Sequence, residues 1–308
     1  MRLVFAGTPA VAVISLRALL SSTHEVVGVL TRPDAPAGRG RRLTPSPVAE
    51  LARAEGIDTL TPRRVGEADV LSWLRARRPD VAPVVAYGSL IPPAALVVPR
   101  YGWVNLHFSL LPAWRGAAPV PHAIAAGDEV TGVTTFALDA GMDTGGVYGT
   151  VAEAIRPADT AGDLLTRLAA SGSRLLLATL DGIQDGTVVP VPQSSEGVSH
   201  APKVSVDDAR VDWSAPALAV ERRVRAYTPD PGAWTTVGDH RVRLGPVLLS
   251  QDGPRLAPGR IAVTAVGVLV GTGSVPVVLG EVAPAGRRAM TAAQWARGAR
   301  LDPATRAQ

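Results

Sequence analysis

The sequence predicts an α/β part with a parallel sheet, followed by a small part built of antiparallel strands. Near the N-terminus, a short apolar run, a helical spacing of apolar residues and a second apolar run follow one another. From Ala233 onward, short Val-rich runs alternate with glycine turns instead. Between these patterns, residues 186–202 are polar and rich in Pro and Ser, a composition typical of linkers. A chain of 308 residues is long enough for two hydrophobic cores.

The first part is predicted to be a doubly wound, Rossmann-like domain. Arg2–Ala6 and Glu25–Leu30 are predicted strands on either side of a helix over residues 10–20, and this order at this spacing opens a parallel sheet. Further strands are predicted at Val81–Ala86, Trp103–His107, Gly132–Leu138 and Val147–Ala152. Further helices are predicted at Pro47–Glu55, Glu67–Arg77, Ala117–Ala126 and Thr160–Asp185. Pro83 counts against its strand, because proline removes a donor from the hydrogen-bond ladder.

The second part is predicted to be a small antiparallel β-barrel, similar to an OB fold. Short strands with frequent glycine turns favour such a barrel. Its strands are predicted at Thr235–Val237, Arg241–Leu244, Arg260–Ala265, Val268–Gly271 and Val275–Val282. Helices are predicted before them, over residues 214–227, and after them, at Thr291–Arg300. We therefore divide the chain into a first domain, 1–185, with an inserted loop, 31–44, then a linker, 186–203, and the barrel, 204–308.

Composition excludes several classes of protein. The chain has no cysteine, which excludes disulfides and thiolate metal sites. No apolar run approaches the ~20 residues that a membrane-spanning helix needs, so we expect a soluble, cytoplasmic protein. Gly7-Thr8-Pro9 follows the first strand in place of a Gly-x-Gly-x-x-Gly fingerprint, and no phosphate-loop lysine motif occurs, which disfavours a nicotinamide oxidoreductase.

Charge is distributed unevenly along the chain. Residues 203–308 contain 14 Lys and Arg against 9 Asp and Glu, whereas residues 1–202 contain 17 against 18. The basic second half suits an anionic partner, although an ordinary solvated surface would have the same composition.

One polar constellation indicates acyl-transfer chemistry. Alternation along Trp103–His107 places Asn105 and His107 on one face, at a strand end of the kind where α/β sheets bind ligands. Asp143 follows within a Gly-Met-Asp-Thr-Gly turn. A carboxylate beside an imidazole can hold it protonated and oriented, and with the Asn105 amide it would offer two donors to an oxyanion. An ordinary buried hydrogen bond and a tight turn are the alternative reading of these residues.

A second candidate is the segment Arg32–Leu43, with four arginines against one aspartate. Strand–helix connections usually have ~2–6 residues, and this one is longer. It is either an arm that contacts phosphates or a solvated insertion.

With these features the chain resembles the methionyl-tRNA formyltransferases, within the folate-dependent formyltransferase superfamily. The resemblance covers nearly the whole chain. The matching segments are Phe5–Pro9, Arg32–Asp34, Pro36–Gly40, Pro45–Val48, Val85–Gly88, Asn105–Pro112, Trp114–Pro119, Asp139–Gly145, Val211–Trp213 and Pro229–Trp234. The Asn-x-His-x-Ser-Leu-Leu-Pro block and the distant Asp143 are specific to the superfamily. The arginine loop and the second domain narrow the resemblance to the tRNA enzymes.

The resemblance implies transfer of a formyl group from 10-formyltetrahydrofolate to the α-amino group of methionyl initiator tRNA, in translation initiation. It implies a catalytic trio of Asn105, His107 and Asp143, in which the amide and a protonated His107 stabilise the oxyanion. The implied folate-site residues are Ser109, Leu110, Leu111 and Pro112. The implied contacts to the tRNA acceptor stem are Arg39, Arg41 and Arg42, while the C-terminal barrel binds the inner flank of the tRNA. We expect a monomer that needs no metal and no nucleotide cofactor.

Three departures from the family pattern stand out: Phe108, Asp230 and the linker sequence His200–Lys203. None affects the trio. Two alternatives remain open. A formyltransferase for glycinamide ribonucleotide or an amino sugar would share the trio but give no reason for the arginine loop and barrel. A catalytically idle tRNA-binding protein would share the shape.

Overall fold

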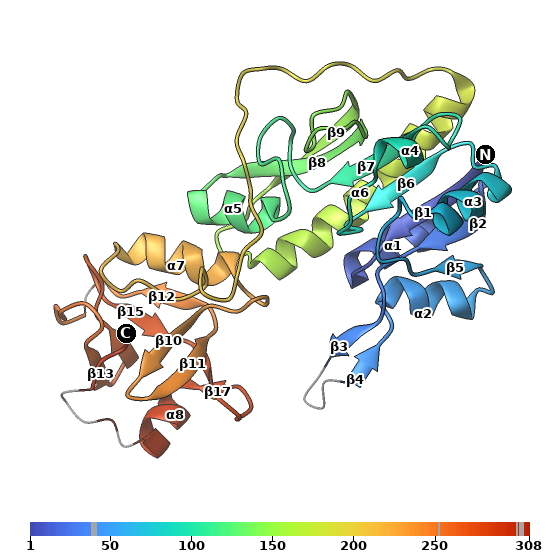
Figure 1. The fold of residues 1–308 in the computed structure, drawn as a ribbon. Coiled ribbons are helices and arrows are strands. Elements are labelled where there is room, and N and C mark those ends of the chain that lie inside the picture. The colour runs from blue at the N-terminus through green and yellow to red at the C-terminus, as the bar shows by residue number, and fades with distance from the viewer. Residues whose placement is uncertain (38–41, 252, 300, 302–304) are drawn as a thin grey trace. The chain divides into compact units, whose positions relative to one another are not determined.

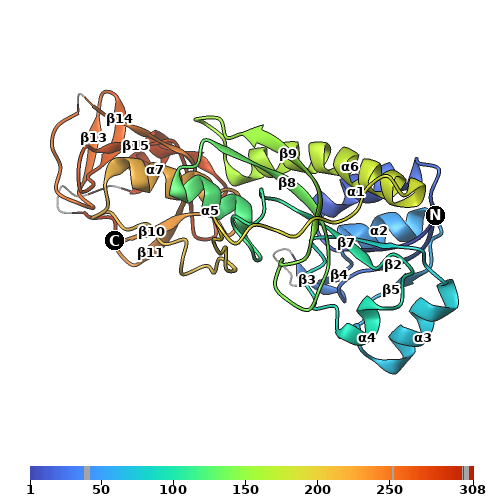
Figure 2. The same ribbon diagram turned by 90° about the horizontal axis from the view of Figure 1, so that it is seen from above.

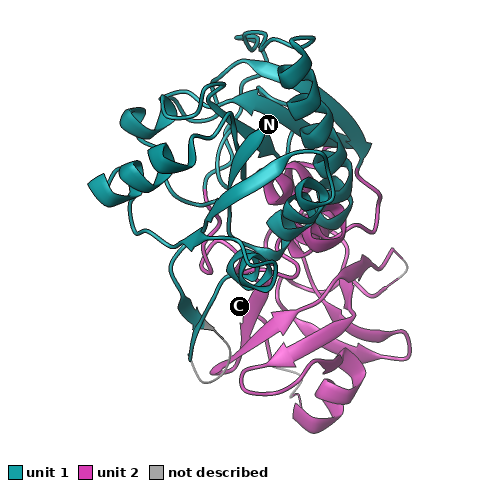
Figure 3. Cartoon of the chain, turned by 90° about the vertical axis from the view of Figure 1, so that its right-hand side faces the viewer, with its two compact units in different colours: residues 1–119, 130–154, 165–202 teal, residues 120–129, 155–164, 203–308 magenta. Residues whose placement is uncertain are grey.

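The computed structural model describes residues 1–37, 42–251, 253–299, 301 and 305–308. It has two compact units (Figure 3). The first unit comprises Met1–Pro119, Val130–Ala154 and Leu165–Pro202. The second comprises Val120–Glu129, Ile155–Leu164 and Lys203–Gln308, so it includes two segments from the first half of the sequence. The division of the chain at 185 and 203 stays a prediction.

A seven-stranded mixed sheet forms the centre of the first unit, in the order β5-β2-β1-β6-β7-β8-β9 (Figure 1). Its strands are β1 (Arg2–Gly7), β2 (Glu25–Leu30), β5 (Thr59–Leu60), β6 (Ala82–Val85), β7 (Trp103–His107), β8 (Val130–Ala137) and β9 (Val147–Ala154). The first five pair in parallel, and β8 and β9 are antiparallel to their neighbours. The α/β prediction is confirmed. β6 forms despite Pro83, because proline removes only one donor from its ladder.

The chain reverses its direction of winding at β1. Ala6 pairs with Leu30 of β2 on one side and with Val84 of β6 on the other. In open α/β sheets, ligands bind outside the carboxyl ends of the strands at such a switch point. The candidate residues Asn105 and His107 lie at the carboxyl end of β7, one strand beyond β6.

Helices cover both faces of this sheet (Figure 2). The helices are α1 (Ala10–Leu20), α2 (Pro47–Ala54), α3 (Ala68–Arg77), α4 (Pro93–Leu96) and α6 (Ala161–Asp185). Trp103 on β7 donates its indole N–H to Ala95 of α4, at 2.9 Å. Leu106, which points to the opposite face, packs against Gly172 of α6. Because side chains alternate, Asn105 and His107 share the face of Trp103, on the side of α3 and α4.

The segment between β2 and α2 contains a hairpin of β3 (Ala35–Ala37) and β4 (Arg42–Thr44). The sequence pattern predicted a loop without strands here, because three-residue strands leave no periodic signal. The ends of the segment are joined by a buried hydrogen bond of 2.6 Å between the hydroxyls of Thr31 and Ser46, and Ser46 also caps α2. Arg39 and Arg41 lie outside the described residues.

The second unit contains the predicted antiparallel strands in two four-stranded sheets, β10-β11-β16-β17 and β12-β15-β14-β13. Its strands are β10 (Trp234–Val237), β11 (His240–Leu244), β12 (Val247–Leu249), β13 (Ile261–Thr264), β14 (Gly267–Val270), β15 (Val277–Leu279), β16 (Glu281–Pro284) and β17 (Met290–Thr291). Its helices are α5 (Pro119–Ala126), α7 (Ala217–Ala226) and α8 (Ala292–Ala299); Arg300, the end of a predicted helix, lies outside the described residues.

The chain passes from one of these sheets to the other at glycines. Gly280 divides the single predicted strand Val275–Val282 into β15 and β16. A Cβ at Gly280 would lie 2.6 Å from the Pro246 carbonyl oxygen, in the connection between β11 and β12, so a side chain would force these corners apart. The predicted fold class, α/β followed by antiparallel β, is confirmed.

Among the described residues, no helix combines the length and apolar character required to cross a bilayer.

Gly132→Ala should destabilise the first unit. A Cβ at Gly132 in β8 would collide with the Val151 carbonyl of β9, which is fixed in the ladder, so we expect a loss of about 1–3 kcal/mol in the free energy of unfolding. Denaturant titration of both variants measures this. The control, Gly298→Ala in α8, places its Cβ in open space and should leave stability equal or up to ~1 kcal/mol higher. Equal stability of Gly132→Ala and the wild type would contradict the close approach.

Candidate active site

The central residues of the site lie on β7 between two hydrogen-bonded neighbours. Asn105 is opposite Val84 of β6 and Phe136 of β8, and His107 is opposite Thr134 of β8. Asn105 is half-buried, and His107 is only 6% exposed. Within the part of the chain that the structure describes, the Asn105 side chain has no protein hydrogen-bond partner, so its amide can bind a ligand.

The tautomer of His107 follows from its partners. Its Nε2 lies 2.9 Å from the Trp114 carbonyl oxygen. A carbonyl oxygen can only accept a hydrogen bond, so Nε2 carries a hydrogen and is the donor. The other nitrogen, Nδ1, faces Oδ2 of Asp143 at 3.8 Å, and Phe136 packs edge-on against the ring. In the neutral imidazole, Nδ1 therefore has the lone pair.

Both partners of His107 belong to loops with unusual backbone conformations. Trp114 and Asp143 have φ angles of 61° and 53°, in the left-handed region that costs a side-chain-bearing residue free energy. The Gly116 N–H donates to Asp143 Oδ2 at 2.7 Å, which joins the two loops directly. A Cβ at Gly145 would collide with the Ala137 carbonyl, so the Asp143 loop returns to β9 through a position that only glycine fits.

Burial lowers the pKa of His107 below its usual 6.5, because the charged ring is poorly solvated. The Asp143 carboxylate and the Trp114 carbonyl raise this pKa, but their effects are smaller than that of burial. The neutral ring is thus favoured at pH 7. This burial opposes the expectation that Asp143 keeps His107 charged, and Nδ1 of the neutral ring keeps its lone pair.

A cavity of about 560 Å³ opens over these residues. This size and a mostly apolar lining are typical of small-molecule sites. Two large apolar side chains on its wall, Leu90 and Met142, are 80% and 70% exposed. Besides Asn105, His107 and Asp143, the lining consists of Val84, Ala86–Ile91, Leu106, Phe108, Gly116, Ala117, Pro119 and Leu138–Met142. The cavity is therefore suited to a largely apolar small molecule that reaches the trio.

The predicted folate-site residues form a turn behind this cavity and are absent from its lining. They are Ser109, Leu110, Leu111 and Pro112. Ser109 is fully buried and donates to the Ala113 carbonyl at 2.6 Å. Thr134 holds the turn from β8, because its hydroxyl donates to the Ser109 carbonyl at 2.7 Å and accepts from the Leu111 N–H at 3.1 Å. The turn directs the chain from His107 toward Trp114.

Sequence reasoning did not assign residues 86–91 and 138–142 to the cavity. The available signal was two loops at predicted strand ends that carry isolated apolar residues, Leu90 and Met142. Arg42, one of the predicted tRNA contacts, is exposed on β4 and does not line the cavity. The structure thus brings the trio together around one cavity, whose lining does not include Arg42.

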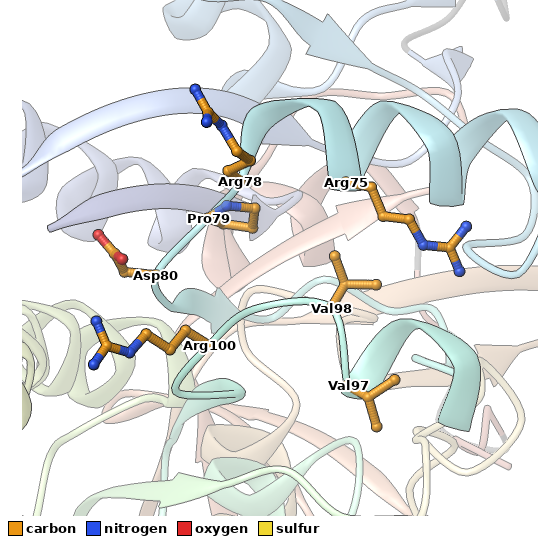
Figure 4. Close-up of a pocket in the computed structure, with 7 residues that line it drawn as sticks. All are labelled: Arg75, Arg78, Pro79, Asp80, Val97, Val98 and Arg100. Atoms are coloured by element: carbon orange, nitrogen blue, oxygen red, sulfur yellow. The ribbon is translucent and has the colours of Figure 1, made fainter.

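A second cavity of about 470 Å³ lies at the opposite, amino-terminal end of β6 (Figure 4). Its lining includes Arg75, Arg78 and Arg100, whose guanidinium groups point in different directions in the figure. Asp80 in its wall already accepts a 2.7 Å hydrogen bond from the Arg2 N–H. These groups do not converge on a ligand. The described residues also include no group of three or more His, Cys, Asp or Glu arranged to hold a metal ion.

Comparison with known proteins gives full-length matches. The family model for formyl transferase matches residues 1–180, and that for the formyl transferase C-terminal domain matches residues 203–300. The chain is 60% identical over 301 residues to methionyl-tRNA formyltransferase of Salinispora tropica, covering 98% of each chain. It is 59% identical over 322 residues to methionyl-tRNA formyltransferase of Acidothermus cellulolyticus, covering 99% of each.

At low sequence identity, similarity to a solved structure supports the fold alone. HypX from Aquifex aeolicus, solved in complex with tetrahydrofolic acid, superposes with a TM-score of 0.63 at 18% identity. The match covers 96% of this chain and 46% of HypX.

The pKa of His107 should lie below 6.5 in the free protein, and Asp143→Asn should lower it further, because the variant lacks the charge that favours the imidazolium. NMR titration of the five histidines measures both values, with the His107 signal identified by its loss in His107→Gln. Because the unfolded chain binds this proton near pH 6.5 and the folded chain only at lower pH, His107 makes stability fall as pH drops below 6.5. A pKa of His107 above 6.5 in the wild type would show that Asp143 raises this pKa more than burial lowers it.

Proposed function

The chain belongs to the formyl transferase family, and from that premise we propose which of its residues carry out the reaction. The reaction is the transfer of the formyl group of 10-formyltetrahydrofolate to the α-amino group of methionyl initiator tRNA, which supports translation initiation. The observation that supports the site is the arrangement of Asn105, His107 and Asp143 around one cavity at the carboxyl ends of the parallel strands. The folate supplies the formyl group on its N10.

Asn105 is proposed to stabilise the oxyanion that forms when the amine attacks the formyl carbon. Its amide lines the cavity without a protein partner, so its N–H can donate to the carbonyl oxygen as negative charge develops there. Asn105 is also the only asparagine in the chain.

His107 is proposed to accept the proton of the attacking amine at Nδ1. The hydrogen bond to the Trp114 carbonyl keeps a proton on Nε2, and burial favours the neutral ring. The lone pair on Nδ1 is therefore available. Once protonated, the ring is next to Asp143, whose carboxylate stabilises the imidazolium and orients it. The proton then passes to N10 of the folate as the bond from N10 to the formyl carbon breaks, leaving tetrahydrofolate and the formylated amine. No covalent enzyme intermediate is needed.

The folate is proposed to bind in the cavity lined by residues 86–91 and 138–142. Support comes from its volume of about 560 Å³, its exposed apolar wall and its position at the carboxyl ends of β6 and β7, next to the switch point of the sheet. Ser109, Leu110, Leu111 and Pro112 would shape this site from behind, since their buried turn fixes the connection between His107 and Trp114.

The tRNA acceptor stem is proposed to contact Arg39, Arg41 and Arg42. Arg42 is exposed on a hairpin whose ends are joined by the Thr31–Ser46 hydrogen bond, so Arg42 is held on a defined stem. The second unit is proposed to bind the tRNA as well, because residues 203–308 have five more basic than acidic side chains, and A-form RNA is recognised largely through its backbone.

We further propose that the protein is a cytoplasmic monomer. The trio belongs entirely to the first unit of one chain, so a second copy is not required to complete it. Charged initiator tRNA is a cytoplasmic substrate.

The acceptor is tested by competition. Purified protein is incubated with 10-formyltetrahydrofolate, methionyl initiator tRNA and glycinamide ribonucleotide together, and the formylated amine is identified by mass spectrometry. We expect only the methionyl amine to be formylated. Formylation of the ribonucleotide would favour the alternative formyltransferase, and formylation of neither would favour an idle tRNA-binding protein.

Asn105→Ala should lower kcat by roughly 10²–10³, as removal of one oxyanion donor does, because the remaining groups cannot replace its N–H. Affinities for the folate and the tRNA should stay within about twofold, since the residue acts mainly on the transition state. Steady-state kinetics and equilibrium binding measure both. His107→Ala is expected to lose turnover too, and wild-type kcat in either variant would exclude the proposed roles.

Arg42→Ala and Arg39→Ala should raise KM for methionyl-tRNA and weaken its salt dependence, because each removes a phosphate contact. Affinity for the folate should not change, since Arg42 does not line the cavity. Kinetics at two salt concentrations measure the effect. The control is Arg53→Ala, an exposed arginine in the last turn of α2. Identical KM values in all variants would remove the loop from tRNA recognition.

A further inference from the structure

A polar segment of the first unit, residues 193–201, runs along both loops that contact His107. We call this segment the strap. It precedes Lys203, where the second unit begins, and its Pro- and Ser-rich sequence predicted only a linker. Two of its side chains, Gln193 and Ser199, are half-buried among mostly exposed neighbours.

Gln193 holds the Asp143 loop. Its side-chain N–H₂ donates to the backbone carbonyls of Asp143 and Gly145, both at 2.8 Å. Its side-chain oxygen accepts from the Arg115 guanidinium, through Nη2 at 2.6 Å and Nε at 3.2 Å. One amide therefore joins the loop of Asp143 to the residue next to Trp114.

Ser199 holds the Trp114 loop. Its hydroxyl accepts the Trp114 N–H at 2.8 Å, and its carbonyl accepts the Arg115 N–H at 2.9 Å. The Ala201 N–H then donates to the Arg115 carbonyl at 2.7 Å. The strap lies close to the backbone of Gly116. A Cβ at Gly116 would lie 2.5 Å from the Ala201 carbonyl oxygen, so a side chain at this position would displace the strap.

The two sets of bonds converge on one histidine. The Trp114 carbonyl accepts the hydrogen bond from Nε2 of His107, and Asp143 faces Nδ1. Both residues are in the left-handed conformation, which persists only where surrounding contacts hold it. The strap supplies those contacts: Ser199 binds the peptide N–H of Trp114, and Gln193 binds the carbonyl of Asp143.

We propose that Gln193 and Ser199 are positioning residues of the formyl transfer, which hold Trp114 and Asp143 where they keep the His107 proton on Nε2 and leave Nδ1 available to accept one. This proposal rests on the proposed role of His107. A purely anchoring role would not require these side chains, because the backbones of Val147 and Val191 already fix the segment just before the strap with two hydrogen bonds, at 2.7 and 2.9 Å.

The test compares four variants by kinetics, NMR titration of His107 and thermal unfolding. Ser199→Ala removes the hydroxyl, and Ser199→Thr retains it. Gln193→Leu removes the amide at similar size. Ser194→Ala is the matched control on the same strap, because Ser194 is exposed and its hydroxyl accepts the nearby Glu196 N–H at 2.9 Å.

We expect Ser199→Ala and Gln193→Leu to lower kcat about tenfold or more, as loss of reactive geometry does, with KM for both substrates within about twofold. The pKa of His107 should also shift, and in Ser199→Ala it should fall, because a displaced Trp114 carbonyl favours the imidazolium less. Ser199→Thr and Ser194→Ala should match the wild type in kcat and in the His107 titration.

Wild-type kcat and an unchanged His107 titration in folded Ser199→Ala and Gln193→Leu would overturn the proposal, as would an equal loss in Ser194→Ala. If Gln193→Leu does not fold, the difference between Ser199→Ala and Ser199→Thr decides the outcome. The titration requires no turnover, so it separates this proposal from the proposed function: full activity of His107→Ala would refute the function, whatever the strap variants show.

Discussion

The hydrogen bond from His107 Nε2 to the Trp114 carbonyl is the constraint on which the arrangement of the site depends. Because a carbonyl cannot donate, this bond determines which ring nitrogen has the lone pair and therefore where a proton can be received. The bond requires Trp114 to hold a left-handed backbone conformation seven residues after the strand ends. The turn at Ser109–Pro112 is held by the Thr134 hydroxyl, and the Trp114 N–H by the Ser199 hydroxyl.

Burial lowers the pKa of His107 and the charge of Asp143 raises it. Because burial has the larger effect, the ring is neutral and can act as a base. A fully exposed imidazole beside a carboxylate would be protonated over a wider pH range and could not take up the amine's proton as readily. At 6% exposure, the cost of desolvation exceeds the attraction of Asp143, whose Oδ2 is 3.8 Å away and also accepts the Gly116 N–H. In the proposed reaction, Asp143 would stabilise the imidazolium after proton transfer.

Backbone strain is concentrated where the chemistry is proposed to occur. Trp114 and Asp143 are two of four non-glycine residues with a positive φ among the described residues, and a third, Ala86, also lines the cavity. Such conformations cost free energy, and they persist because the surrounding structure holds them in place. The strap adds side-chain and backbone hydrogen bonds to the same loops, so a segment with the composition of a linker supports the loops that contact His107.

The sequence by itself determined the order of the main elements and the shared face of Asn105 and His107, because periodicity and residue type are local properties that a chain displays directly. Through its resemblance to a known family, the sequence implied the reaction. It also indicated Asp143, through a motif. Only the tertiary structure decided which His107 nitrogen is protonated, that burial outweighs the carboxylate, and that residues 86–91 and 138–142 rather than Ser109–Pro112 line the cavity. These facts depend on contacts between segments as distant as Trp114 and Ser199, and no local pattern records such contacts.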